Sequence, residues 1–201
     1  MLHFYGIHGR SVDQPYLHYL INFLGGTLEK MIDQRTKLGF ELTKDFGTQI
    51  LKGLQFMHSQ HVAHRDLKAD NVLLNRERNI VKIADMGLAK IVRTDRQLSS
   101  MPIYSAGAPI IQSPEQKAGR ANGKKNDMWL FGLLIIWMFH GKRTLFRFMD
   151  ECEIENYPDP SAQESPNFNE LLSAIFVPEK QRYDATNLLY KLEGGWSCAI
   201  S

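Results

Sequence analysis

The longest amphipathic pattern in the sequence lies between residues 42 and 60. Its apolar residues recur every three or four positions, and they are Leu42, Phe46, Ile50, Leu54 and Met57. Residues at this spacing share one face of an α-helix. The pattern therefore predicts an amphipathic helix that ends near residue 60 and leads directly into residues 61–64.

Apolar spacing also predicts helices at residues 128–140, 167–176 and 184–192, with Asp184 suited to the N-cap of the last one. A short helix is expected around Leu28, Met31 and Ile32. The apolar run at residues 129–139 is too short to span a bilayer, so it predicts a buried core helix and no membrane span. Residues 156–169, rich in Pro, Ser, Asn and Glu, predict a surface loop.

Two short apolar runs, residues 72–74 and 81–84, are separated by the polar residues 75–79. This arrangement predicts a β-hairpin. A hairpin brings the segments that flank it to the same end, so we expect the charged residues 64–71 and 85–87 to form one cluster. Residues 16–20 are strand-like as well. A little β structure before a mainly helical body predicts the α+β fold class.

Composition narrows the function classes. The chain of 201 residues is 43% hydrophobic and 23% charged, within the range of soluble globular proteins. A net charge of +2 provides no basic footprint for nucleic acid, so no nucleic-acid partner is expected. The two cysteines form neither a disulfide framework nor a metal motif, which predicts a reducing, cytoplasmic compartment. The N-terminus has no secretory signal pattern.

Residues 64–71 read HRDLKADN, and residues 85–87 read DMG. They resemble the catalytic loop and the metal-binding triplet of the eukaryotic-type protein kinase family. Phosphoryl transfer requires little covalent chemistry and much positioning, together with an anionic group that accepts the hydroxyl proton. The resemblance implies that Asp66 accepts this proton and that Lys68 offsets charge on the transferred phosphate.

The resemblance also implies the cofactors ATP and Mg²⁺, with Asn71 and Asp85 as metal ligands and as contacts to the bound nucleotide. Oxygen ligands suit this hard cation, whereas His or Cys would suit zinc. Lysine at Lys68 is similar to Ser/Thr kinases, because tyrosine kinases usually place Ala or Arg there. The implied activity is transfer of the ATP γ-phosphoryl group to Ser or Thr of a protein substrate.

The same resemblance implies an ion pair near the end of the activation segment. Residues 107–109 and 113–115 are similar to the end of an activation segment, with Ser113 where Ala is commonest in the family. Glu115 is expected to pair with Arg182, because a planar guanidinium suits a buried bidentate pair.

Asp127 and Gly132 resemble the start of the family's central buried helix, whose aspartate holds the catalytic loop from beneath. His64 is expected to brace this loop rather than to transfer protons.

Several residues between the metal triplet and residue 113 are candidates for phosphorylation, namely Thr94, Ser99, Ser100 and Tyr104. Arg65, beside Asp66, is the type of residue that pairs with a phosphorylated loop. An upstream kinase that acts on this segment is therefore a candidate partner.

The sequence departs from the family pattern at its N-terminal side. It contains no Gly-rich turn over the phosphates, no strand lysine that grips them and no helix glutamate that positions this lysine. Residues 4–6 and 16–24 resemble the last strands of the small lobe and the hinge. The resemblance places Ile21 near the gatekeeper position and implies nucleotide contacts from Ile21, Asn22 and Leu24.

The expected domain division is a small-lobe remnant at residues 1–24, a C-terminal kinase lobe at 25–195 and a tail at 196–201. Met86 replaces the usual Phe, a tolerable hydrophobic exchange. Ala108 replaces a Thr whose hydroxyl usually joins Asp66 and Lys68, so it bears on substrate alignment.

Three functions remain open from the sequence. The first is a Ser/Thr kinase whose remaining small-lobe motifs lie upstream, with catalysis dependent on them. The second is a non-catalytic scaffold or decoy that occupies a kinase's partners. A metal-dependent hydrolase that reuses the carboxylates ranks last, because no motif beyond the kinase ones supports it.

Overall fold

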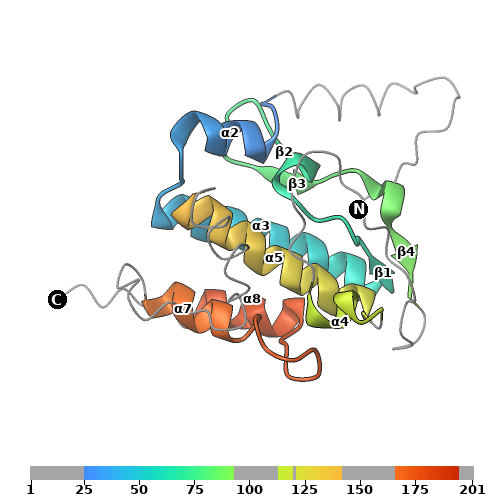
Figure 1. Cartoon of the computed structure of the whole chain (residues 1–201). Coiled ribbons are helices and arrows are strands. Elements are labelled where there is room, and N and C mark those ends of the chain that lie inside the picture. The colour runs from blue at the N-terminus through green and yellow to red at the C-terminus, as the bar shows by residue number, and fades with distance from the viewer. Residues whose placement is uncertain (1–24, 93–112, 120, 142–165, 195–201) are drawn as a thin grey trace, which may run out of the picture.

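The computed structural model describes residues 25–92, 113–119, 121–141 and 166–194. Mainly helical, with two small antiparallel sheets, these residues have the predicted α+β character (Figure 1). The elements in chain order are α2 (Leu28–Arg35), α3 (Phe40–Ser59), β1 (Val62–Ala63), η1 (Ala69–Asn71), β2 (Val72–Leu74), β3 (Val81–Ile83), η2 (Met86–Leu88), β4 (Lys90–Ile91), α4 (Pro114–Lys117), α5 (Gly123–His140), α7 (Pro166–Ser173) and α8 (Ala185–Gly194).

Helix α3 confirms the amphipathic prediction. Phe46, Ile50 and Leu54 are buried, as the spacing required, and the helix packs against α5, α8 and β3. The helix begins two residues before the first predicted apolar position, after the extended N-cap Gly39. It ends at Ser59, so the chain enters β1 after two turn residues.

Helix α5 is buried around its whole circumference, from residue 126 to residue 139. A helix that is apolar on every side is stable only inside a core. It starts five residues before the predicted start, because Asn122 caps it: its Oδ1 accepts hydrogen bonds from the amides of Lys124 at 3.0 Å and Lys125 at 3.3 Å. The polar first turn had concealed this start from the apolar pattern.

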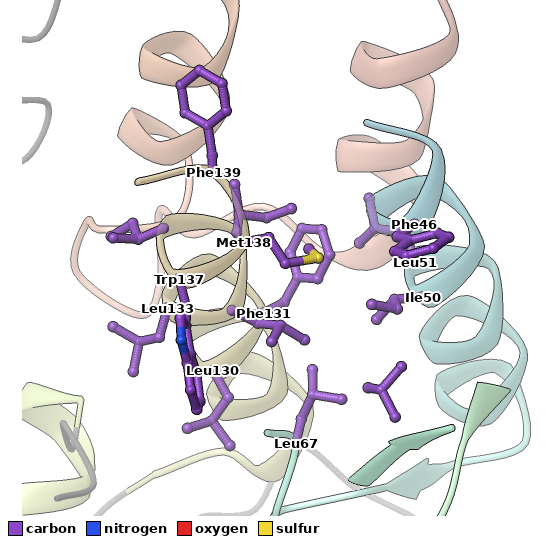
Figure 2. Close-up of a cluster of buried hydrophobic side chains, with 14 of the residues drawn as sticks. Phe46, Ile50, Leu51, Leu67, Leu130, Phe131, Leu133, Trp137, Met138 and Phe139 are labelled. Carbon is purple, nitrogen blue, oxygen red and sulfur yellow. The ribbon is translucent and has the colours of Figure 1, made fainter. Parts of the chain in front are cut away.

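The main core lies between α3 and α5. Figure 2 shows Phe46 and Ile50 of α3 on one side and Phe131 and Met138 of α5 on the other. Leu67, in the loop that follows β1, lies below them. Complete burial of a Leu, Ile, Phe or Met side chain stabilises the folded protein by about 1.5–3 kcal/mol. The loop that carries the kinase-like motif is thus anchored in the core by Leu67.

Gly132 allows α5 to approach the turn after α7 closely. A Cβ at this position would lie 2.8 Å from Ile175 Cγ2 and 2.8 Å from Phe176 Cζ. These side chains are buried, with little room to move. Glycine is therefore required here by packing rather than by backbone conformation.

The predicted hairpin is confirmed. Strands β2 and β3 pair antiparallel, with Val72 opposite Ile83 and Leu74 opposite Val81. Asn75 closes the turn, because its Oδ1 accepts hydrogen bonds from the amides of residue 79 at 3.0 Å and residue 80 at 2.8 Å. A second pair, β1 with β4, was not predicted. Each of its strands has two residues, too few for alternation to be detected.

Helices α7 and α8 confirm the last two predicted helices. Helix α7 begins at Pro166, so the predicted loop at residues 156–169 is wrong for its last four positions. Asp184 caps α8 as expected: its Oδ1 accepts a hydrogen bond from Asn187 N at 2.8 Å. Helix α8 packs along α3, and Lys52 of α3 forms an ion pair of 2.9 Å with Glu193.

The strand-like segments at residues 4–6 and 16–20 lie outside the described residues. Among the helices that are described, none is both long enough and apolar enough to cross a membrane.

Arg182 links α4, α5 and the segment before α8, and it is 1% exposed. Its Nη1 donates to the carboxylate of Glu115, which confirms the predicted pair. The guanidinium also donates to the carbonyls of Ile175 at 2.8 Å and Val177 at 3.0 Å, and lies 4.9 Å from the ring centroid of Trp129. The buried positive charge is therefore compensated by a carboxylate and by several carbonyl groups.

Replacement of Arg182 by Ala should lower the free energy of unfolding by about 3–5 kcal/mol, because it leaves the carboxylate of Glu115 without its partner. Chemical denaturation measures this loss. Lys52→Ala is the matched control, since the two side chains of its ion pair are 57% and 52% exposed. The control should lose less than about 1 kcal/mol. Equal losses in the two variants would reject the structural role of Arg182.

Candidate active site

Asp127 fixes the backbone of the loop that follows β1. Its Oδ2 accepts a hydrogen bond from the amide of His64 at 2.8 Å, and its Oδ1 accepts one from the amide of Arg65 at 2.7 Å. The carboxylate is completely buried in the first turns of α5. Hydrogen bonds to a buried charged acceptor are stronger than neutral ones. The expectation that Asp127 holds this loop from beneath is confirmed.

His58, near the end of α3, is a third donor to the same carboxylate. Its Nε2 lies 2.8 Å from Asp127 Oδ2. Sequence reasoning missed this residue, because a single His on a helix carries no spacing that identifies a partner 69 positions away. With it, α3, α5 and the loop meet at one side chain.

His64 connects the loop to the end of β3. Its Nε2 lies 2.9 Å from the carbonyl of Ala84, and its Nδ1 accepts a hydrogen bond from the amide of Asp66 at 3.3 Å. A carbonyl can only accept, so these partners assign the proton to Nε2. The buried ring thus joins the backbone of Asp66 to the residue before Asp85, as a bracing role requires.

Three side chains of the motif converge. Lys68 Nζ lies 3.0 Å from Asp66 Oδ2, and Asn71 Nδ2 lies 2.9 Å from the same oxygen. Asn71 Nδ2 also donates to the carbonyl of Asp66 at 2.8 Å. The Asp66 carboxylate is therefore held in one orientation by a cation and an amide, while 15% of its side chain stays exposed.

The hairpin places Asn71 and Asp85 at the same end, as predicted. The two residues follow the register of β2 and β3, and the amide of Ala84 donates to the carbonyl of Asn71 at 2.8 Å. Asp85 is exposed, and its Oδ1 accepts a hydrogen bond from Gly87 N at 3.1 Å. The backbone of the hairpin thus brings Asp85 to the loop that carries Asp66.

The donor set fits a magnesium ion. Because Asn71 directs its nitrogen to Asp66, the amide atom that remains for a cation is an oxygen, and Asp85 provides carboxylate oxygens. Within the residues that the structure describes, no three His, Cys, Asp or Glu side chains gather as a metal cluster. Magnesium is usually held by only one or two protein carboxylates, together with water and phosphate oxygens.

Arg65 and Asp85 both have left-handed backbone conformations, with φ of 73° and 58°. Non-glycine residues rarely adopt such angles, which cost energy and persist only where the surroundings enforce them. Here the enforcing contacts are the bond from Arg65 N to Asp127 and the bond from Gly87 N to Asp85. Thr36, His61 and Arg78 of the described residues have positive φ as well, so such conformations flank the candidate site but are not confined to it.

The structure thus brings Asp66, Lys68 and Asn71 into contact and places Asp85 beside them through the hairpin. The predicted nucleotide contacts Ile21, Asn22 and Leu24 lie outside the described residues. So do Ala108 and the phosphorylation candidates at residues 94–104.

Comparison with known proteins identifies the family. The model of the "Protein kinase domain" family matches residues 7–191. The chain belongs to the protein kinase family. The match covers the loop, the hairpin, α5 and most of α8, so every residue of the site described above lies inside the kinase domain.

Curated relatives agree with this assignment. The serine/threonine-protein kinase nekl-2 of Caenorhabditis elegans is 36% identical over 129 residues, covering 60% of this chain and 35% of that protein. Protein kinase C-like 1 of the same organism is 35% identical over 159 residues, covering 79% and 22%. Human mitogen-activated protein kinase kinase kinase 3 is 25% identical over 198 residues, covering 94% and 31%. The matched part of the chain therefore spans between 22% and 35% of these relatives' lengths.

Asp127→Asn should weaken the attachment of the loop at residues 64–71 to α5, because the neutral amide cannot accept hydrogen bonds from three donors as a carboxylate does. We expect the free energy of unfolding to fall by about 2–3 kcal/mol. Amide hydrogen exchange at His64 and Arg65 should accelerate more than exchange in α8. Asp70→Asn, an exposed acidic residue of the same loop, is the control and should leave both measurements unchanged. Unaltered exchange at the two amides in Asp127→Asn would contradict the holding role.

Proposed function

We propose that this protein is a serine/threonine protein kinase that transfers the γ-phosphoryl group of ATP to a hydroxyl of a protein substrate. One observation supports the proposal most strongly: Lys68 and Asn71 bind a single carboxylate oxygen of Asp66, at 3.0 and 2.9 Å. A general base must be within reach of its proton and held in one orientation. The two bonds hold the Asp66 carboxylate in this way.

Asp66 is the proposed base. Lys68 and Asn71 bind its Oδ2, so we assign Oδ1 to the substrate hydroxyl proton. Lys68 is 31% exposed, so its ammonium group can also offset charge on the phosphoryl group in transfer. Asp127 accepts hydrogen bonds from the amides of His64 and Arg65, and the ring of His64 accepts one from the amide of Asp66. These bonds maintain the backbone conformation of Asp66.

Asn71 and Asp85 are the proposed magnesium ligands. A bound magnesium ion neutralises charge on the phosphate oxygens during transfer. The role of the protein is to present two oxygen donors at one end of the hairpin. Asp85 is exposed and strained, both of which suit a residue that binds a metal–nucleotide complex from solvent.

The first described residues after the predicted hinge are held against β2. Gly25 N donates to the carbonyl of Leu74 at 3.0 Å, and Leu74 N donates to the carbonyl of Gly26 at 2.9 Å. A Cβ on Gly25 would lie 1.9 Å from the carbonyl oxygen of Asn75, so only glycine fits. Residue 25 is thereby fixed to β2, the strand that follows Asn71. Residues 21, 22 and 24 remain proposed nucleotide contacts on the family resemblance alone.

Two features favour Ser/Thr specificity over tyrosine. Lys68 occupies the position where the family's Ser/Thr members carry lysine, and nekl-2 is named a serine/threonine kinase. A Ser- or Thr-containing protein is thus the proposed substrate, and an upstream kinase that modifies residues 94–104 is the proposed regulator. The proposed location is the cytoplasm. The proposed C-terminal kinase lobe comprises residues 25–195.

Asp66→Asn should lower kcat for phosphoryl transfer by at least about 10²-fold, because the amide cannot accept the proton. The assay follows labelled phosphate from ATP to casein, with the full-length protein. Asp70→Asn is the control, since this carboxylate lies in the same loop and is exposed to solvent. The melting temperatures of both variants should match that of the wild type. An Asp66→Asn protein as active as Asp70→Asn would remove Asp66 from the mechanism.

Asp85→Asn tests the metal site separately. We expect weaker binding of ATP in the presence of Mg²⁺, by roughly tenfold or more, because a charged oxygen ligand is lost. Titration calorimetry should be run with and without Mg²⁺. In the absence of Mg²⁺ the affinities of wild type and variant should converge. A variant that binds Mg²⁺–ATP as tightly as the wild type would exclude Asp85 as a ligand.

A further inference from the structure

Gln49 of α3 connects this helix to the hairpin through its side-chain amide. Its Oε1 accepts a hydrogen bond from Val81 N at 2.9 Å, and its Nε2 donates to the carbonyl of Asn79 at 3.0 Å. The same nitrogen donates to Asp45 Oδ2, one helical turn earlier, at 3.1 Å. A carbonyl and the N–H two residues later are groups that a neighbouring strand would bond. Gln49 takes the place of such a strand at the start of β3.

The closure of the turn does not require this contact. Asn75 Oδ1 already accepts hydrogen bonds from the amides of residues 79 and 80, and Asn75 N donates to the carbonyl of residue 80 at 3.0 Å. These bonds lie within the hairpin, whereas Gln49 lies 32 positions from Val81 in the chain. What Gln49 adds is an attachment of the hairpin to α3.

Apolar packing alone does not fix the position of β3 along α3. Gly53, one turn after Gln49, lies close to this strand: a Cβ on it would approach Ile83 Cδ1 to 3.0 Å. Apolar contacts of this kind are non-directional, whereas a hydrogen bond requires a short distance and a favourable angle. The two hydrogen bonds of Gln49 to the hairpin therefore fix where β3 lies along the helix.

The far end of β3 leads to Asp85, the proposed metal ligand. Just before it, the amide of Ala84 donates to the carbonyl of Asn71 at 2.8 Å. The carbonyl of Ala84 lies 2.9 Å from His64 Nε2, in the loop that α5 holds. The strand is thus attached to the helical body at two points, Val81 and Ala84. Two points determine the direction of a strand, whereas a single point lets it pivot.

Asp85 is especially sensitive to such a pivot. Its φ of 58° is a left-handed conformation, which costs energy and persists only where the surroundings enforce it. Its Oδ1 accepts a hydrogen bond from Gly87 N at 3.1 Å in this conformation. Because the backbone of Asp85 is strained, a small displacement of β3 should relax it and reorient the carboxylate relative to Asn71.

We propose that Gln49 is a positioning residue for the magnesium–nucleotide complex. By attaching the start of β3 to α3, it maintains the orientation in which Asp85 and Asn71 present oxygen atoms at one end of the hairpin. This inference rests on the proposed function, in which these two residues bind the metal. It predicts that Gln49 governs affinity for Mg²⁺–ATP and leaves affinity for ATP without Mg²⁺ unaffected.

Gln49→Met in the full-length protein removes the hydrogen bonds to the hairpin and keeps an unbranched side chain of similar helix propensity. Titration calorimetry should show roughly fivefold weaker binding of Mg²⁺–ATP and unchanged binding of ATP without Mg²⁺. Gln55→Met is the matched control, because Gln55 lies on the same helix but donates to Thr186 of α8 at 3.2 Å. The control should bind as the wild type does. Equal affinities in the two variants, or equal weakening with and without Mg²⁺, would overturn the proposal.

A double-mutant cycle with Asp85→Asn shows whether Gln49 acts through Asp85. Asp85→Asn alone should weaken binding of Mg²⁺–ATP roughly tenfold, and addition of Gln49→Met should weaken it no further. Distant residues with independent roles have additive effects, so a role unrelated to Asp85 would give roughly fiftyfold weaker binding in the double variant. Additive effects would therefore contradict the proposal.

A wild-type protein that binds no Mg²⁺–ATP would contradict the proposed function, and Gln49 is then tested without nucleotide. The amide of Gly87 reports on Asp85, because the two are hydrogen-bonded. Amide hydrogen exchange at Gly87 should be about fivefold faster in Gln49→Met than in Gln55→Met. This result would support the positioning of Asp85 by Gln49, and equal exchange in the two variants would overturn it.

Discussion

The burial of α5 is the constraint on which the rest of the structure depends. Its side chains are covered from residue 126 to residue 139, so the helix cannot shift without opening the core that it shares with α3. Such a helix is a rigid base for any group attached to its end. Its first turns use this rigidity: the Lys125 carbonyl, the Asn126 amide and the Asp127 carboxylate each hold a different segment.

From that base, two chains of hydrogen bonds lead to the candidate chemistry. One passes from Asp127 to the amides at the start of the loop and so fixes Asp66. The other passes through the buried ring of His64 to Ala84, next to Asp85. The proposed base, Asp66, and the proposed metal ligand, Asp85, are therefore both positioned by hydrogen bonds that lead from α5. This suits phosphoryl transfer, in which catalysis depends on positioning and electrostatics rather than on covalent steps.

Much of this arrangement could be predicted from the sequence. The spacing in α3 identified its buried face, because an amphipathic helix repeats its environment along the chain. The hairpin followed from two apolar runs, and the contacts of Asp127 and Arg182 followed from the family pattern. Features that produce no repeating apolar pattern could not be predicted from the sequence. They are the two-residue strands β1 and β4, the polar first turn of α5 and the contact of His58. The contacts of Gln49 with the hairpin could not be predicted either, because a single Gln on a helix carries no spacing that identifies its partner.

The proposed kinase activity is tested most directly by following the γ-phosphoryl group of labelled ATP, given to the full-length wild-type protein with Mg²⁺ and casein. The arrangement described here predicts label in phosphoserine and phosphothreonine of casein, and none when Mg²⁺ is removed. Label that appears only as free phosphate would identify a hydrolase, and the absence of any transfer would favour a non-catalytic scaffold; either result would contradict the account.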